Sequence, residues 1–187
     1  IRYFINYQIN HMYIRYFMWN FVGKQNAKQG HGELSNGNWI SGINFLDNAR
    51  LGPQDNIPNH LKNNAGRNNF YFLPLILGLL GFFHHYKKNP KDTWSVFLLF
   101  FFTGIAIVIE LNQTPFQPRE RDYAYVGSFY AFSIWIGLGS IFIYEIINKL
   151  TNNIKTSTFI SCLLFTVPFM MAIEGWDDHD RSNRYTA

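Results

Sequence analysis

Cysteine is nearly absent from this chain of 187 residues, and so are the signatures of several soluble enzyme classes. The single cysteine, Cys162, lies in an apolar run and is expected to pack as a small residue. One cysteine cannot form a paired CxxC motif, and it carries no information on the compartment. The sequence also contains no GxxxxGK phosphate loop, no GxSxG nucleophile turn and no HExxH metal motif. Any chemistry of this chain is therefore of another kind.

Charge is scarce, at 15% of residues, whereas 48% are hydrophobic and 19% are aromatic. Mean hydropathy is nevertheless close to neutral, so the apolar residues must be concentrated in blocks. The formal net charge is +4, but lysine and arginine are scattered along the chain, which argues against a nucleic-acid partner. High aromatic content suits a protein that packs rings against lipid and anchors them at the membrane interface.

Four segments approach the roughly 20 apolar residues that a helix needs to cross a hydrocarbon core about 30 Å thick. They run from Phe70 to Phe83, from Trp94 to Leu111, from Ala124 to Ile147 and from Thr158 to Trp176. The first is short, and a re-entrant segment is its alternative. The sequence predicts an all-α, polytopic, multi-pass integral membrane protein with about four transmembrane helices.

Lysines cluster in two short loops, His84 to Asp92 and Asn148 to Lys155. Two predicted spans separate these loops, so they lie on the same side, and the positive-inside rule makes that side cytoplasmic. The region before Phe70, the loop from Thr114 to Tyr123 and the tail after Trp176 then meet on the extracytoplasmic face, periplasmic or lumenal. Glu145 lies four residues before Lys149, a spacing typical of an ion pair on a helix surface.

Three regions follow from this pattern. Residues 1–69 are expected to form an extracytoplasmic interfacial helix and an irregular loop, 70–176 a transmembrane bundle, and 177–187 the start of an extracytoplasmic tail. Residues 1–22 place apolar side chains on two helical faces separated by polar stripes, which favours an interfacial helix over a fifth span. The chain starts at Ile1 and stops at Ala187 within a polar segment, so we expect it to be a fragment of a longer protein.

Charged residues crowd the stretch ELNQTPFQPRERDYAY between two predicted spans. Arg119 and Arg121 can hold a phosphate bidentately, and the carboxylates of Glu120 and Asp122 could orient them or bind a divalent cation. The structural alternative is a salt-bridge cluster that fixes two helices. Glu110, just inside its span, is expected to pair with one of the two arginines or to hold the loop down. The candidate site residues are Glu110, Arg119, Glu120, Arg121, Asp122, Tyr123, Tyr125 and Trp176.

Two other polar groups are weaker candidates. Asp177, Asp178 and His179 offer oxygen and nitrogen ligands to a metal, but adjacent residues on one helix cannot all face one ion, and a solvated end of the span is the alternative. The turn Gly30-His31-Gly32-Glu33 is more typical of a loop hydrogen bond than of catalysis. The chain therefore predicts no cofactor of its own, and a divalent metal stays open.

Several stretches resemble glycosyltransferase family 117, the protein O-mannosyltransferase-like membrane family formerly described as a domain of unknown function. They are NYQINHMYIRYFMWNFVGKQN at 6–26, NWISGI at 38–43, LNQTPFQPRERDYAYVGSFYAFSIWIGLG at 111–139 and WDDHDRSNRYTA at 176–187. The resemblance covers nearly the whole chain, and the stretch at 111–139 is its most specific part. It implies a polytopic C-type glycosyltransferase that uses a polyprenyl-phosphate sugar as donor.

The resemblance also implies roles for the candidate residues. Arg119 and Arg121 would clamp the donor phosphate as negative charge develops on the leaving group. Tyr123, Tyr125 and Trp176 would frame the sugar or the lipid neck. The family's catalytic carboxylate lies in a first extracytoplasmic loop upstream of Ile1, so this chain lacks the base that would deprotonate a protein Ser or Thr hydroxyl.

The expected activity is therefore transfer of a sugar, mannose by resemblance, from a polyprenyl-phosphate donor to a protein acceptor, with the fragment inactive by itself. The partners are membrane lipid, the lipid-linked donor and the acceptor protein. Two alternatives from other classes stay open. One is a noncatalytic scaffold or assembly subunit, in which the charged cluster docks a partner protein. The other is a transporter of lipid-linked or anionic solutes, with Glu110 as its coupling carboxylate.

Overall fold

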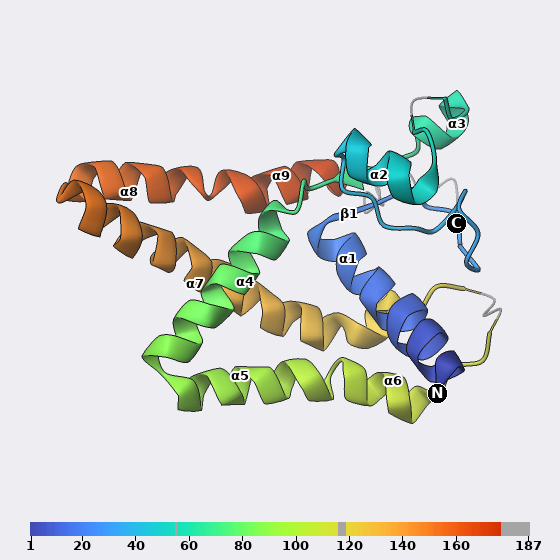
Figure 1. The fold of residues 1–187 in the computed structure, drawn as a ribbon, viewed down its shortest axis with the longest axis horizontal. Coiled ribbons are helices and arrows are strands. Elements are labelled where there is room, and N and C mark those ends of the chain that lie inside the picture. The colour runs from blue at the N-terminus through green and yellow to red at the C-terminus, as the bar shows by residue number, and fades with distance from the viewer. Residues whose placement is uncertain (55, 116–118, 177–187) are drawn as a thin grey trace.

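The computed structural model describes residues 1–54, 56–115 and 119–176, and it is mostly helical, which confirms the predicted class. The long helices extend across the molecule, two of them crossing near its middle, and the short elements gather at one end (Figure 1). The helices are η1 (Phe4–Ile14), α1 (Arg15–Phe21), α2 (Asn44–Leu51), α3 (Asn59–Lys62), α4 (Leu73–Lys88), α5 (Pro90–Phe102), α6 (Ile105–Leu111), η2 (Asp122–Tyr125), α7 (Val126–Thr151), α8 (Ile154–Leu163) and α9 (Thr166–Glu174). Strands β1 (Gly23–Lys24) and β2 (Asn68–Asn69) pair antiparallel.

Three helical stretches of the described residues are long and apolar enough to cross a membrane, which indicates a membrane protein. They are Pro90–Leu111, Asp122–Thr151 and Ile154–Glu174, and they match the last three predicted spans. The first predicted span becomes α4, whose 16 residues measure about 24 Å, short of a hydrocarbon core of about 30 Å. The structure thus supports three candidate spans where the sequence predicts about four.

The two lysine-bearing turns lie at the same end of the helices (Figure 1). In the first, the side chain of Asn89 caps α5 and Pro90 occupies the first helical turn. In the second, the Asn153 side chain accepts the backbone N–H of Lys155 at 3.0 Å. This shared position agrees with the predicted loop arrangement, while the side of the membrane stays a prediction.

An ion pair joins α4 to α7 at this end and corrects one expectation. The carboxylate of Glu145 pairs with Lys88, and His84 Nε2 lies 3.8 Å from its other oxygen. Lys149, four residues further along the same helix, is not the partner. Glu145 therefore links two helices rather than decorating the surface of one.

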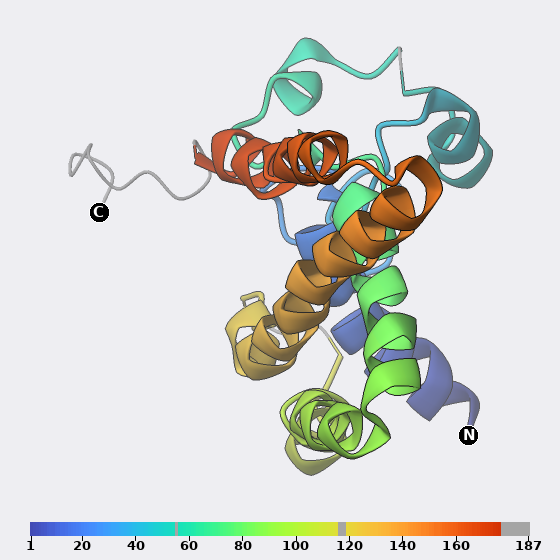
Figure 2. The ribbon, with the colours of Figure 1, turned by 90° about the vertical axis from the view of Figure 1, so that its left-hand side faces the viewer.

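Glycines let α4 and α7 cross in close contact. A Cβ atom at Gly81 would overlap the carbonyl oxygen of Trp135, and one at Gly139 would overlap that of Leu77. Figure 2 shows α4 and α7 crossing in the middle of the molecule, with α5–α6 on one side and α8–α9 on the other. The crossing thus holds the two outer layers together.

The N-terminal segment forms one continuous helix that packs on this frame. Its first part, η1, is a π-helix, and the backbone N–H of Arg15 donates to the carbonyl oxygen of Asn10. Tyr13 is buried and its hydroxyl hydrogen-bonds Ser128 Oγ at 3.1 Å, whereas Phe4 and Ile5 are exposed. Although the sequence places Arg15 in a polar stripe, it is only 6% exposed. This helix is not among the three candidate spans.

Residues between β1 and β2 form an irregular region stabilised by polar side chains. The carboxylate of Asp47 accepts the backbone N–H groups of Ser41 and Gly42 at 2.9 and 2.8 Å. An isolated bridge joins Lys24 to Trp39. The region contains two short helices, α2 and α3, that no sequence period predicts.

Candidate functional site

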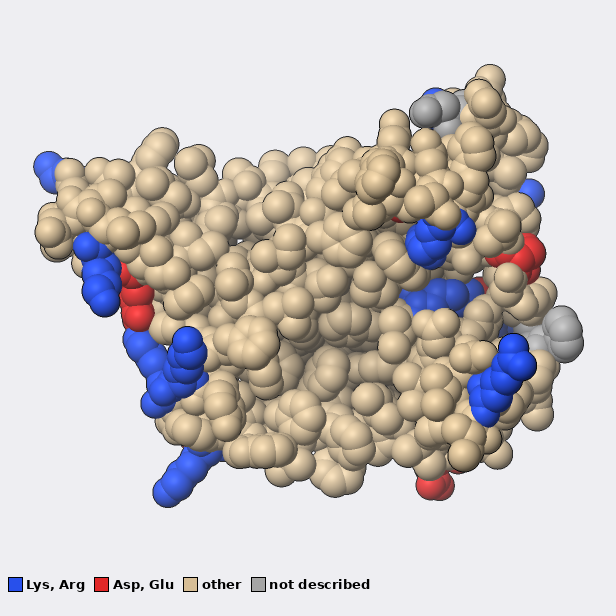
Figure 3. Space-filling model, viewed as in Figure 1, with Lys and Arg blue, Asp and Glu red and all other residues tan. Residues whose placement is uncertain are grey.

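Polar segments from distant parts of the sequence meet at the end of the molecule opposite the lysine-bearing turns. The N-terminal helix, the β1–β2 region, the start of η2 and the end of α9 all lie there (Figure 1). On the visible face, charged side chains occur at the two ends and the surface between them is uncharged (Figure 3). The region before Phe70 and the loop before η2 thus meet as the loop pattern predicts, while the tail after Trp176 lies outside the described residues.

A bidentate ion pair between Glu120 and Arg15 organises this end. Arg15 Nη1 lies 3.2 Å from Oε1 of Glu120, and Nη2 lies 3.0 Å from Oε2. Arg15 also donates to the carbonyl oxygens of His11 and Gly37, at 2.9 and 3.0 Å. All three donor nitrogens of the guanidinium are therefore engaged, and the pair joins segments 105 residues apart in the sequence.

Aromatic rings enclose the same pair. The guanidinium carbon of Arg15 lies 4.5 Å from the Tyr16 ring centroid and 4.9 Å from that of Trp19, which adds cation–π attraction. The Tyr16 hydroxyl donates a hydrogen bond to Glu120. Burial alone would raise the pKa of Glu120, but the hydrogen bonds and charge of Arg15 outweigh it and lower that pKa. Glu120 is therefore held as a carboxylate.

The turn at 30–33 also reaches this carboxylate. The backbone N–H of Gly30 donates to Glu120 Oε1 at 3.2 Å, and that of His31 donates to Glu33 Oε2 at 2.7 Å. These contacts agree with the loop-hydrogen-bond interpretation of the turn. Glu120 thus connects three segments, which is the structural alternative considered for the charged cluster.

Arg119 and Arg121 flank Glu120 but do not share its ion pair. Within the described part of the chain neither guanidinium has a carboxylate partner, and Arg119 lies 5.5 Å over the ring of Tyr123. Arg119 is exposed and Arg121 is half-buried. The expectation that Glu120 orients these two arginines is wrong, because Arg15 takes its carboxylate instead.

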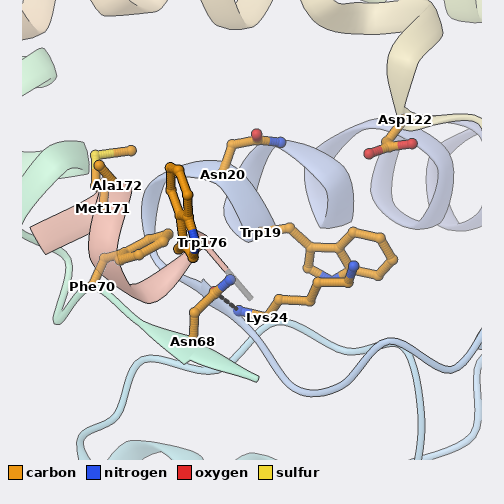
Figure 4. Close-up of a pocket in the computed structure, with 10 residues that line it drawn as sticks. Trp19, Asn20, Lys24, Asn68, Phe70, Asp122, Met171, Ala172 and Trp176 are labelled. Carbon is orange, nitrogen blue, oxygen red and sulfur yellow. Dashed lines mark hydrogen bonds between the residues drawn. The ribbon is translucent and has the colours of Figure 1, made fainter. Parts of the chain in front are cut away.

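A cleft of about 370 Å³ opens beside the charged cluster (Figure 4). It lies between α1, the two strands, the start of η2 and the end of α9. Lys24 Nζ is 4.9 Å from the Trp19 ring centroid, and the Lys24 backbone N–H donates to Asn68 Oδ1 at 2.8 Å. The lining residues are Trp19, Asn20, Lys24, Asn68, Phe70, Asp122, Met171, Ala172, Gly175 and Trp176.

The cleft combines the groups that bind a polar, ring-shaped ligand. The exposed indole of Trp176 offers a flat apolar surface, two asparagines offer donors and acceptors, and Lys24 and Asp122 supply one charge of each sign. The Trp19 indole N–H is buried without a hydrogen-bond partner among the described residues. The cleft brings together two of the predicted site residues, Asp122 and Trp176.

The other predicted residues lie elsewhere. Tyr125 is fully buried in the core, where its ring packs edge-on at 5.6 Å from that of Tyr13, so it frames no ligand. Tyr123 is 57% exposed and does not line the cleft. Glu110 is exposed at the end of α6, and its expected ion pair with Arg119 or Arg121 is absent from the described residues.

The metal candidates are not placed by the structure. Asp177, Asp178 and His179 lie outside the described residues. In the described ranges, no group of three or more histidine, cysteine, aspartate or glutamate side chains is arranged to hold a metal ion.

Three residues of this end escaped the sequence-based prediction. Arg15, Trp19 and Lys24 contribute to the ion pair or the cleft, yet each lies about 100 residues before the charged cluster. A usable signal is present at Arg15, since an arginine that lies among the aromatic residues of α1 and is buried there requires a partner.

Comparison with models of known protein families, with curated proteins and with solved structures gives no significant match to this chain.

Proposed function

We propose that this chain is the membrane part of a glycosyltransferase that moves a sugar, mannose by resemblance, from a polyprenyl-phosphate donor to a protein Ser or Thr hydroxyl. The observation that carries the proposal is the arrangement of residues 119–122, Arg-Glu-Arg-Asp. Arg15 neutralises Glu120, so Arg119 and Arg121 keep their positive charge available at the end of the candidate spans, beside a cleft with two indoles. A lipid-linked sugar phosphate presents its anionic head at the membrane surface, where such spans end.

The reaction requires little covalent chemistry from these residues. The acceptor oxygen attacks the anomeric carbon, the bond from that carbon to the phosphate oxygen breaks, and polyprenyl phosphate leaves with the bonding electrons. Arg119 and Arg121 stabilise the charge that develops on the phosphate. Trp176 packs against the sugar. The acceptor proton passes to a carboxylate outside this chain.

The test is sugar transfer from a polyprenyl-phosphate donor by the full-length protein. Arg119→Ala and Arg121→Ala should each lower kcat/KM by about tenfold to a hundredfold, the effect of removing a charged hydrogen-bond donor from a transition state. Lys62→Ala is the matched control, since it removes an exposed positive charge from α3. Unchanged transfer in both arginine variants, at wild-type expression, excludes the clamp.

A scaffold role is the second candidate, because the exposed rings and charges of Arg119 and Tyr123 also suit a protein-docking patch. In that case the wild type shows no sugar transfer, and Arg119→Ala abolishes capture of a partner protein.

A further inference from the structure

A second hollow lies in the membrane-spanning part of the molecule. It has a volume of about 370 Å³ and lies between α7 and the α8–α9 stretch, with Leu77 of α4 also in its lining. We call this hollow the groove. Met171 lines both the groove and the polar cleft. The remaining lining residues of the groove are Ser133, Ile136, Gly137, Ser140, Leu164, Phe165 and Pro168.

Local sequence explains why the groove exists. Pro168 lacks a backbone N–H, so the helix cannot form its regular bond to Leu164, whose carbonyl accepts Val167 N–H at 3.1 Å instead. The helical stretch is interrupted there, between α8 and α9. On the facing helix, a Cβ atom at Gly137 would meet nothing within 4 Å, unlike those at Gly81 and Gly139. Gly137 therefore serves no close packing and leaves the groove open.

We propose that this groove holds the hydrocarbon chain of an anionic lipid whose head occupies the polar cleft. The inference rests on the proposed function and adds the route of the donor's polyprenyl tail. Three features of the structure select this occupant. The groove lies within candidate membrane spans, and it is lined mainly by apolar side chains. It also shares Met171 with the polar cleft, which is lined by Lys24 and by Asp122, the residue next to Arg121 in the sequence.

An apolar chain gains no hydrophobic free energy by moving from lipid into such a groove, because lipid tails are equally apolar. Its role is positional. A tail seated between α7 and α9 aligns the phosphate with the cleft, so a tail that cannot enter must leave the head misplaced or outside. Long and short chains should therefore bind the wild type with similar affinity, and only the long chain should bind more weakly when the groove is filled.

The variant that fills the groove is Gly137→Phe, for which the structure offers open space at Cβ. The matched control is Ile134→Phe, a partly exposed position on the same helix that does not line the groove. Binding is measured on the full-length protein in nanodiscs with two fluorescent probes, a long-chain polyprenyl phosphate and citronellyl phosphate.

Gly137→Phe should weaken binding of the long-chain probe by at least about tenfold, the size of an overpacking penalty, and leave the short-chain probe unchanged. Ile134→Phe should change neither. Equal long-chain affinity in Gly137→Phe and wild type overturns the groove assignment.

A measurement on the wild type does not depend on folding of the variant. A diazirine in the tail of the long-chain probe should cross-link residues 133–140 and 164–171, whereas labelling spread evenly over α5 and the other lipid-facing helices contradicts the proposal. The two proposals fail separately. If sugar transfer depends on the arginines but the groove binds no tail, only the tail route is excluded. If the groove binds the tail but no sugar is transferred, only the glycosyltransferase proposal is excluded.

Discussion

At the scale of single residues, one carboxylate decides how the charged cluster works. Glu120 accepts from Arg15, Tyr16 and the backbone of Gly30, so it belongs to the framework. The cluster itself stands out in the sequence, as does its position between two spans. The partner of Glu120 does not, because a contact between residues 15 and 120 leaves no local pattern. The predicted ion pair of Glu110 with Arg119 or Arg121 is wrong for a related reason. These residues are close in sequence, but the fold does not bring them into contact.

Breaking the ion pair should destabilise the chain strongly. Arg15→Ala leaves the Glu120 carboxylate partly buried without its cation, and we expect a loss of about 3 kcal/mol in the free energy of unfolding. Glu120→Gln should cost less, because the amide can still accept one hydrogen bond. The measurement is unfolding of residues 1–187 in detergent, and the double variant should lose less than the sum of the two.

The same variants separate charge from shape through pH. The lowered pKa of Glu120 means that its contribution to stability is present above the ordinary value of 4.5 and is lost as pH falls through the folded pKa. Glu120→Gln should remove this part of the acid sensitivity. An acid profile identical to that of the wild type would contradict the assignment.

At the scale of elements, the hydrophobic runs predict the helices well and their interruptions poorly. The predicted spans from Trp94, Ala124 and Thr158 correspond to helical stretches starting at Pro90, Asp122 and Ile154. The break after Phe102 and the one after Leu163 were not predicted. The glycine at position 104 has a tertiary reason, because a Cβ there would lie 2.6 Å from the Tyr13 hydroxyl oxygen. Composition alone cannot report such a contact.

Glycines on α7 should differ sharply in their tolerance of a methyl group. Gly139→Ala places Cβ against the backbone of Leu77 and should cost about 1 to 3 kcal/mol or more by forcing α4 away. Gly137→Ala on the same helix meets open space and should be neutral or slightly stabilising, since alanine favours helix. Thermal unfolding of the two variants in the same detergent makes the comparison, and equal midpoints would refute the close crossing of α4 and α7.

At the scale of the whole molecule, the distribution of charge along the helices agrees with the arrangement predicted from the loops. The lysine-bearing turns share one end and the N-terminal helix and the start of η2 share the other (Figure 1), and charged side chains gather at both ends of the visible face (Figure 3). Alternation of spans and loops is a global constraint that sequence can express. The cleft could not be predicted from this alternation, because its walls come from four separate segments.

Labelling in intact cells should reveal the two ends as two sides of a membrane. In a Cys162→Ser background, cysteines placed at Lys91 and Lys155 should both be shielded from an impermeant maleimide, whereas one at Leu34 should react. Leu34 is 63% exposed, so its accessibility is not limited by folding. Reaction at Lys91 or Lys155 with protection at Leu34 would reverse the orientation.

The π-helical winding of η1 makes the length of this segment matter more than its composition. The helix contacts the loop before η2 at two points. Gln8 Nε2 donates to the carbonyl oxygen of Gln113 at 2.7 Å, and Arg15 pairs with Glu120. Deleting one residue between these two contacts turns one relative to the other by roughly a quarter of a turn. Such a deletion would uncouple the two anchors, whereas most exchanges of side chain at Phe4 or Ile5 would leave both in register.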